Sequence, residues 1–241
     1  MKNNILVLLL SPLMAFGQSL SMHEKFEAGD SISYTVVTSG KSKKLEYFFS
    51  KSDKNLFAGK VIFDGKDGEF SAPGVGFEEQ DFALSNEQMT IRTPAVKLFE
   101  PTMQVGMKWT NFFNSISQEY QVQVIQKVVV EKFEKVKLKF AEIDCFKIVT
   151  SDVYQVLTDK SEIVSGKGGS KIWVGVINNR ILIIKREYQN SFGAKLEQIL
   201  NEPPKFPDTQ KRLEKLKELY TGGLINDSEY EKKKMEILKN F

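Results

Sequence analysis

Residues 172–184 read IWVGVINNRILII, and this stretch decides the fold class. Two apolar runs, 172–176 and 181–184, flank the pair Asn178-Asn179, which tolerates the positive φ angles of a two-residue type I′ turn. The pattern therefore predicts an antiparallel β-hairpin.

Similar short runs, separated by Gly, Asn, Asp and Ser, occupy most of the chain before residue 190. Residues 31–38 and 45–49 are predicted strands joined through Ser39-Gly40, and 60–63 precedes a turn at 64–68. This body shows no sustained helical period, so the sequence predicts a mainly β, antiparallel domain.

Residues 135–140 alternate strictly between lysine and apolar residues. This period predicts a strand that places Val136, Leu138 and Phe140 on a buried face and three lysines in water.

Regular strand spacing weakens between residues 71 and 94. Residues 71–77, SAPGVGF, predict a long connection across the mouth of the sheet. A packed crossover is favoured here over a binding loop.

Composition excludes several classes of protein. The chain has 241 residues and a net charge of +3, from 34 Lys+Arg and 31 Asp+Glu, which gives no basic field for nucleic acid. One histidine and one cysteine exclude zinc sites of Cys/His type, disulfide frameworks and ordinary Cys–His or Ser–His dyads. Cys145 lies in a predicted strand and is expected to be a buried thiol, with a reactive thiol as the alternative.

No group of residues forms a convincing catalytic or metal site. His23 is expected to be a solvated terminal residue, and residues 64–67 have too few oxygens for a calcium loop. Residues 166–170, GKGGS, lack phosphate-loop spacing and predict a mobile hairpin loop. The acidic cluster Glu78-Glu79-x-Asp81 is expected in a solvated loop. We therefore predict no enzyme activity, no metal and no cofactor.

Residues 1–17 have the pattern of a secretory signal peptide. Lys2 is followed by an apolar stretch at 5–16, and Ala15 and Gly17 supply the small residues of a cleavage site before Gln18. The alternative is a membrane anchor, but about 12 apolar residues fall short of the roughly 20 that span a bilayer. The mature chain has no later transmembrane segment in its sequence, and we expect it to be periplasmic or secreted.

The last forty residues change character. Residues 201–208 contain three prolines and predict a linker, because proline removes a backbone donor and restrains the preceding residue. A helical period follows from Thr209, and Gly222-Gly223 ends it. Asn226 and Glu229 then have the spacing of a capping box, which predicts a second helix.

This tail, residues 209–240, resembles the SHOCT domain, a short helical hairpin found at the C-terminus of many bacterial proteins. The resemblance rests on the leucines of the first helix, on Gly223-Leu224-Ile225, and on the EYExKK run that begins at Glu229. It implies oligomerisation or partner binding. The residues predicted to bind the partner are the apolar ones of this hairpin: Leu213, Leu216, Leu219, Leu224, Ile225, Tyr230, Ile237 and Leu238.

Residues 98–190 more weakly resemble exported bacterial β-domains of the TapB-like group. The matching motifs are the PTMQVGMKW stretch from Pro101 and the final hairpin from Ile172, although Glu142 and Asn178-Asn179 replace glycines of that group. The resemblance implies a curved antiparallel sheet, such as a half-barrel, and no known activity.

Together these patterns divide the chain into a signal peptide (1–17), an antiparallel β-domain (18–200), a proline-rich linker (201–208) and a helical hairpin (209–241). The leading hypothesis is an exported, non-enzymatic protein that associates with itself or with another exported protein. The alternative is a carrier of an apolar ligand such as a lipid, because eighteen phenylalanines and a curved sheet could line a cavity.

Overall fold

The computed structural model describes most of the predicted body and tail. The described residues are 26, 29–52, 56–73, 81–84, 87–93, 96, 99, 102–116, 121–157, 163–178, 180–206 and 209–238. The predicted signal peptide, His23 and the pair Glu78-Glu79 lie outside them, as does most of the predicted connection at 71–77.

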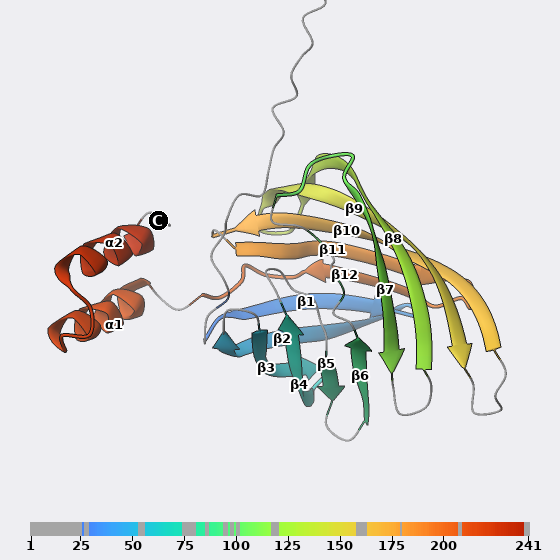
Figure 1. Cartoon of the computed structure of the whole chain (residues 1–241), viewed down its shortest axis with the longest axis horizontal. Coiled ribbons are helices and arrows are strands. Elements are labelled where there is room, and N and C mark those ends of the chain that lie inside the picture. The colour runs from blue at the N-terminus through green and yellow to red at the C-terminus, as the bar shows by residue number, and fades with distance from the viewer. Residues whose placement is uncertain are drawn as a thin grey trace, which may run out of the picture.

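The described residues form a mainly β body followed by two helices (Figure 1). The strands are β1 (Ser31–Thr38), β2 (Lys41–Ser52), β3 (Leu56–Phe63), β4 (Lys66–Pro73), β5 (Asp81–Leu84), β6 (Glu87–Thr93), β7 (Lys108–Ile116), β8 (Gln121–Lys137), β9 (Glu142–Leu157), β10 (Ile163–Ile177), β11 (Arg180–Asn190) and β12 (Lys195–Leu200). The helices are α1 (Thr209–Thr221) and α2 (Asp227–Leu238).

Each strand pairs antiparallel with its neighbours in the chain, and β1 also pairs with β12, so the strand pairing closes on itself. The longest strands, β8 to β10, bend strongly around the body (Figure 1). The contact between β6 and β7 is short and runs only from Ile91 to Thr93 on the β6 side. The predicted mainly β, curved antiparallel sheet with two C-terminal helices is confirmed, and its strand order closes further than a half-barrel would.

The predicted tight turns are present. Ile177 pairs with Arg180, and Asn178 has a φ of 46°, so a two-residue turn joins β10 to β11 as expected. Asp64 and Gly65, with φ values of 53° and 81°, make a similar turn between β3 and β4. This turn is shorter than the predicted 64–68, because residues 66–68 already belong to β4. These residue types adopt the left-handed region at low cost, which explains their positions in the sequence.

Two predictions about the strands need correction. The region of weak strand spacing contains the end of β4 and the strands β5 and β6, so the predicted long connection at 71–77 begins inside β4. The alternating stretch 135–140 is not one strand, because β8 ends at Lys137 and the Leu138 N–H donates to the Ala141 carbonyl in the following turn. Leu138 is nevertheless buried, since the turn keeps its side chain on the core side.

Buried side chains form two apolar clusters. The first gathers residues from β1 to β4 with the ends of β9 to β12, and Tyr34, Tyr47 and Phe70 are among its aromatic members. In the second, Val96, Phe99 and Met103 pack against strands β8 to β11. These three residues between β6 and β7 are therefore part of the core of the β body.

A buried ion pair joins the beginning and end of the β body. Arg180 Nε lies 3.0 Å from Asp30 Oδ2, and their side chains are 2% and 0% exposed. The guanidinium also stacks on the Phe206 ring, with Cζ 4.3 Å from the centroid. Ser31 and Lys205 exchange two backbone hydrogen bonds nearby, so the first part of the predicted linker is attached to the edge of β1.

Candidate functional site

The ends of the two helices are capped by local sequence. Asn226 Oδ1 accepts a hydrogen bond from the Glu229 N–H, and Glu229 Oε2 accepts one from the Asn226 N–H, both at 3.0 Å. This is the predicted capping box. Gly223 ends α1 with a φ of 68°, and the Leu224 N–H donates to the Leu219 carbonyl, as in a Schellman motif.

The hairpin has only a small core. Leu216 and Ile237 are buried, and the rings of Tyr220 and Tyr230 stack with centroids 4.5 Å apart. Lys234 lies over the Tyr230 ring at 5.6 Å. These contacts hold the two helices together, but such a unit has too little core to be strongly stable alone.

The structure separates the predicted partner-binding residues by exposure. Leu216 of α1 and Ile237 of α2 are buried. Four more of the set are half-buried: Leu213, Leu219, Ile225 and Tyr230. Leu224 and Leu238 are exposed, at 73% and 43%. Sequence reasoning did not include Met235, which is 64% exposed and lies three residues before Leu238 on the same helical face.

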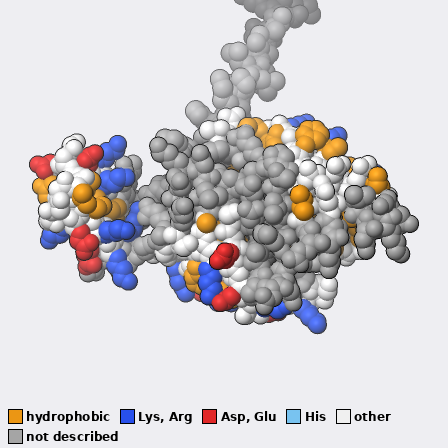
Figure 2. Space-filling model, turned by 60° about the horizontal axis from the view of Figure 1, so that its bottom comes forward, with side chains coloured by type: hydrophobic (Ala, Val, Ile, Leu, Met, Phe, Trp, Pro, Cys, Tyr) orange, Lys and Arg blue, Asp and Glu red, His pale blue; other side chains and the backbone are white. Residues whose placement is uncertain are grey.

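The hairpin stands apart from the strands and continues from the segment after β12 (Figure 1). Figure 2, from a different direction, shows hydrophobic side chains on the hairpin between Lys/Arg and Asp/Glu side chains. Neither described helix is long and apolar enough to cross a membrane.

The titratable groups of the β body include two strongly buried ones. Burial raises the pKa of the Cys145 thiol to about 12, and nearby Asp144 and Glu134 add to this. This confirms the predicted buried thiol. Burial also raises the pKa of Asp152 above the ordinary carboxyl value, although hydrogen bonds from Gln126 and Thr150 act in the opposite direction. Within the described ranges, no three His, Cys, Asp or Glu side chains gather as a metal site would require.

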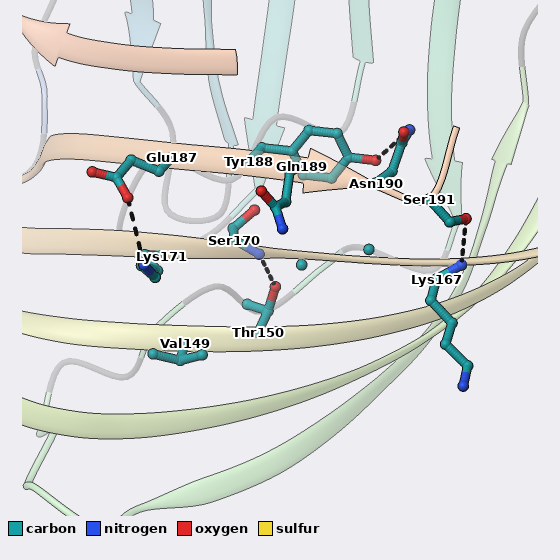
Figure 3. A pocket seen from close by; sticks show the side chains of 12 residues that line it. Val149, Thr150, Lys167, Ser170, Lys171, Glu187, Tyr188, Gln189, Asn190 and Ser191 are labelled. Carbon is teal, nitrogen blue, oxygen red and sulfur yellow. Dashed lines mark hydrogen bonds and ion pairs between the residues drawn. The ribbon is translucent and has the colours of Figure 1, made fainter. Parts of the chain in front are cut away.

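A pocket of about 510 Å³ lies where β9, β10 and β11 run side by side (Figure 3). It is lined by Val149, Thr150, Lys167, Gly168, Gly169, Ser170, Lys171, Glu187, Tyr188, Gln189, Asn190 and Ser191. Residues 166–170 are therefore inside strand β10, and the prediction of a mobile hairpin loop is wrong.

Close approach of neighbouring groups explains these glycines. A Cβ on Gly169 would lie 2.3 Å from the Thr150 carbonyl oxygen, and one on Gly166 would lie 2.3 Å from the Tyr154 ring. Glycine at these positions thus reflects contact between strands, a signal that sequence alone does not distinguish from a turn.

Comparison with protein families identifies the tail. Residues 211–238 match the family model described as "Short C-terminal domain", SHOCT. The match agrees with the resemblance found in the sequence and covers both helices apart from the first residues of α1. No curated protein matches the chain in sequence.

Two solved structures resemble the chain. One is described as the hypothetical lipoprotein YmcC from Escherichia coli (K12), with 9% identity and a TM-score of 0.44 over 73% of this chain and 86% of that one. The other is described as "a putative lipoprotein from Parabacteroides distasonis", with 12% identity and a TM-score of 0.48 over 78% of this chain and 98% of that one.

Proposed function

We propose that the chain is an exported, non-enzymatic protein whose C-terminal hairpin binds the hairpin of a second copy. The observation that carries the proposal is the exposure of Leu224, Met235 and Leu238 on a helix pair in which, among the side chains that the structure describes, just Leu216 and Ile237 are buried. Burying apolar surface contributes about 25 cal/mol per Å², so association would supply the stability that the small core lacks.

The strands do not cover the exposed apolar residues of the hairpin, because the two helices stand apart from the strands (Figure 1). The SHOCT match supports an interaction role for this segment. Having one histidine and one cysteine in the whole chain supports the non-enzymatic part of the proposal.

Native mass spectrometry and light scattering of residues 18–241 test the association. We expect the wild type to be a multimer and the double variant Met235→Lys/Leu238→Lys to be a monomer. The two lysine side chains added to each copy would have to be buried at the interface, and burying their charges opposes association. Val105→Lys is the matched control, since Val105 is an apolar residue of the β body that is also exposed. Deleting residues 207–241 should likewise remove association and leave the β body folded.

Other results would redirect the proposal. A bare wild-type monomer at all concentrations contradicts self-association and directs the search to a different exported partner. A monomer that carries the extra mass of a lipid supports the alternative function, transport of an apolar ligand.

Export is tested at the N-terminus of the protein recovered from cells. We expect the mature chain in the periplasmic fraction or the medium to begin at Gln18, partly cyclised to pyroglutamate. Recovery of the chain with Met1 and the following leader intact would contradict cleavage after Gly17.

A further inference from the structure

We propose that the outer face of strands β7 to β10 binds the surface of an anionic lipid bilayer. This face belongs to the β body, so it takes no part in the association proposed for the hairpin. Two patterns on the face carry the proposal: a row of exposed apolar side chains, and a set of lysines with no carboxylate among them.

Strand pairing defines the outer face. The four strands run side by side (Figure 1), and residues paired across neighbouring strands point to the same side of a sheet. Phe112 pairs with Ile125, and Ile125 pairs with Val153. Val153 in turn pairs with Lys167, so these four residues form one row across β7, β8, β9 and β10. The residues that point to the opposite side are buried in the core: Gln126, Val128, Thr150 and Asp152.

Three neighbouring positions of this row are exposed apolar side chains. Phe112, Ile125 and Val153 are 64%, 44% and 46% exposed. Directly paired residues lie about 5 Å apart, so the three side chains make one continuous patch. Ile116 and Ile163 are also exposed on this face, at the end of β7 and the start of β10. An exposed apolar patch bordered by polar residues is typical of a surface that contacts a partner or a membrane.

The charged residues of the outer face are all lysines. From residue 108 to residue 116 of β7, and at the paired positions of β8 to β10, the face has four lysines and no Asp or Glu: Lys108, Lys127, Lys167 and Lys171. All four are exposed. Lys171 lies 3.8 Å from Glu187 of β11, and the other three form no ion pair with any residue that the structure describes. The face therefore presents positive charge that its own residues do not neutralise.

An anionic bilayer matches both patterns at once. Its negative surface attracts lysines, and apolar side chains gain by entering the boundary between the headgroups and the acyl chains. Lysine suits this position, because its apolar stem can lie along the boundary while the ammonium group stays among the headgroups. A second copy of the same face is a poorer partner, since its lysines would repel these ones.

Sedimentation of residues 18–241 with lipid vesicles tests the proposal. One set of vesicles contains phosphatidylglycerol mixed with phosphatidylcholine, and the other contains phosphatidylcholine alone. We expect the chain to sediment with the anionic vesicles and much less with the uncharged ones. Binding should weaken as salt is added, because mobile ions screen the attraction between the lysines and the headgroups.

Variants of the two kinds of residue separate their contributions. Lys127→Gln and Lys167→Gln should each weaken binding to the anionic vesicles about fivefold, the effect of one lysine near an anionic membrane, and should reduce the salt dependence. Phe112→Ser should weaken binding roughly tenfold and leave the salt dependence unchanged, because it removes apolar contact alone.

Matched controls come from β2, which lies outside this face. Lys41 and Phe48 are both exposed there, so Lys41→Gln and Phe48→Ser should leave vesicle binding unchanged. Circular dichroism of each variant shows whether it is folded.

Four results would overturn the proposal. If anionic vesicles do not bind the chain, the face has no lipid partner, and an acidic protein becomes the partner to seek. Equal binding to phosphatidylcholine alone would mean that the lysines do not select the surface. Equal losses in the β2 controls would mean that binding is not located on this face. Loss of binding on deletion of residues 207–241 would place it on the hairpin instead, whereas the self-association proposed above has its own test.

Discussion

Replacing Arg180 should destabilise the β body far more than replacing any exposed cation. Its ion pair with Asp30 is almost fully buried, with Nε 3.0 Å from Oδ2. The variant Arg180→Met leaves the Asp30 carboxylate in the interior without this guanidinium. Breaking a buried pair in this way costs about 3–5 kcal/mol, because the remaining carboxylate is buried away from water and has lost its counter-ion.

The stacked aromatic ring adds to this cost. Arg180 Cζ lies 4.3 Å from the centroid of Phe206, and a desolvated cation–π contact contributes up to about 2 kcal/mol. Taking about 4 kcal/mol for the ion pair and about 1 kcal/mol for the ring contact, and about 3 °C per kcal/mol for a chain of this length, the Tm should fall by roughly 15 °C.

Chemical and thermal unfolding of three variants measure the effect. Lys43→Met is the control, because Lys43 pairs with Asp64 at 3.2 Å on the surface and should contribute less than about 1 kcal/mol. The double variant Asp30→Asn/Arg180→Met removes both charges, so it should be more stable than Arg180→Met alone.

Hydrogen exchange adds a structural readout, because the backbone amides of residues 201, 202, 205 and 206 should exchange faster in Arg180→Met. The reasoning is refuted if Arg180→Met costs no more than Lys43→Met, or if the double variant is no more stable than the single one. Either result would mean that the ion pair does not hold the segment after β12 to the start of β1.

Three further predictions concern single residues. Because the pKa of Asp152 is raised by burial, its ionisation opposes folding, so the wild type should lose stability relative to Asp152→Asn as the pH rises from 3.8 through the raised pKa; urea unfolding at several pH values measures this, and a pH-independent difference would contradict it. Cys145, with a pKa of about 12, should resist a thiol reagent at neutral pH until the protein unfolds, whereas labelling of the native chain at the unfolded rate would show that the thiol is accessible. Gly169→Ala should cost about 1–3 kcal/mol, because its Cβ would clash with the Thr150 carbonyl; unchanged thermal stability would show that the strands can separate freely there.

The features that were predictable from sequence are those encoded within a few residues. Asn178 and Asp64-Gly65 specify tight turns through their own backbone preferences. The capping box needs only Asn226 and Glu229, three positions apart. Each of these signals is complete before any distant part of the chain is placed, which is why hairpins and helix ends were correctly assigned.

Features that depend on distant contacts were missed. From the sequence, the glycines between residues 166 and 169 indicate a loop. In the structure they lie in a strand, and glycine is needed there because the Tyr154 ring and the Thr150 carbonyl of β9 come too close for a larger side chain. The pocket that they help to form was invisible for the same reason. The ion pair of Asp30 with Arg180 also joins residues that are far apart in the sequence, before β1 and at the start of β11, and neither residue type indicates the other as its partner.

The attachment of residues 201–206 changes how the hairpin can associate. Three prolines predict a linker at 201–208 through which no sheet runs, yet Lys205 keeps its N–H and exchanges backbone hydrogen bonds with Ser31 at the edge of β1. Only residues 207 and 208 then separate Phe206 from the start of α1, so their Cα positions bound the distance from Phe206 to Thr209 at about 11 Å. The first turn of α1 is therefore held close to the end of the β body where Asp30 meets Arg180. If two hairpins associate, this end of one β body must come close to the same end of the second body. The ion pair holds residues 201–206 in place and would thereby limit the distance between the two bodies.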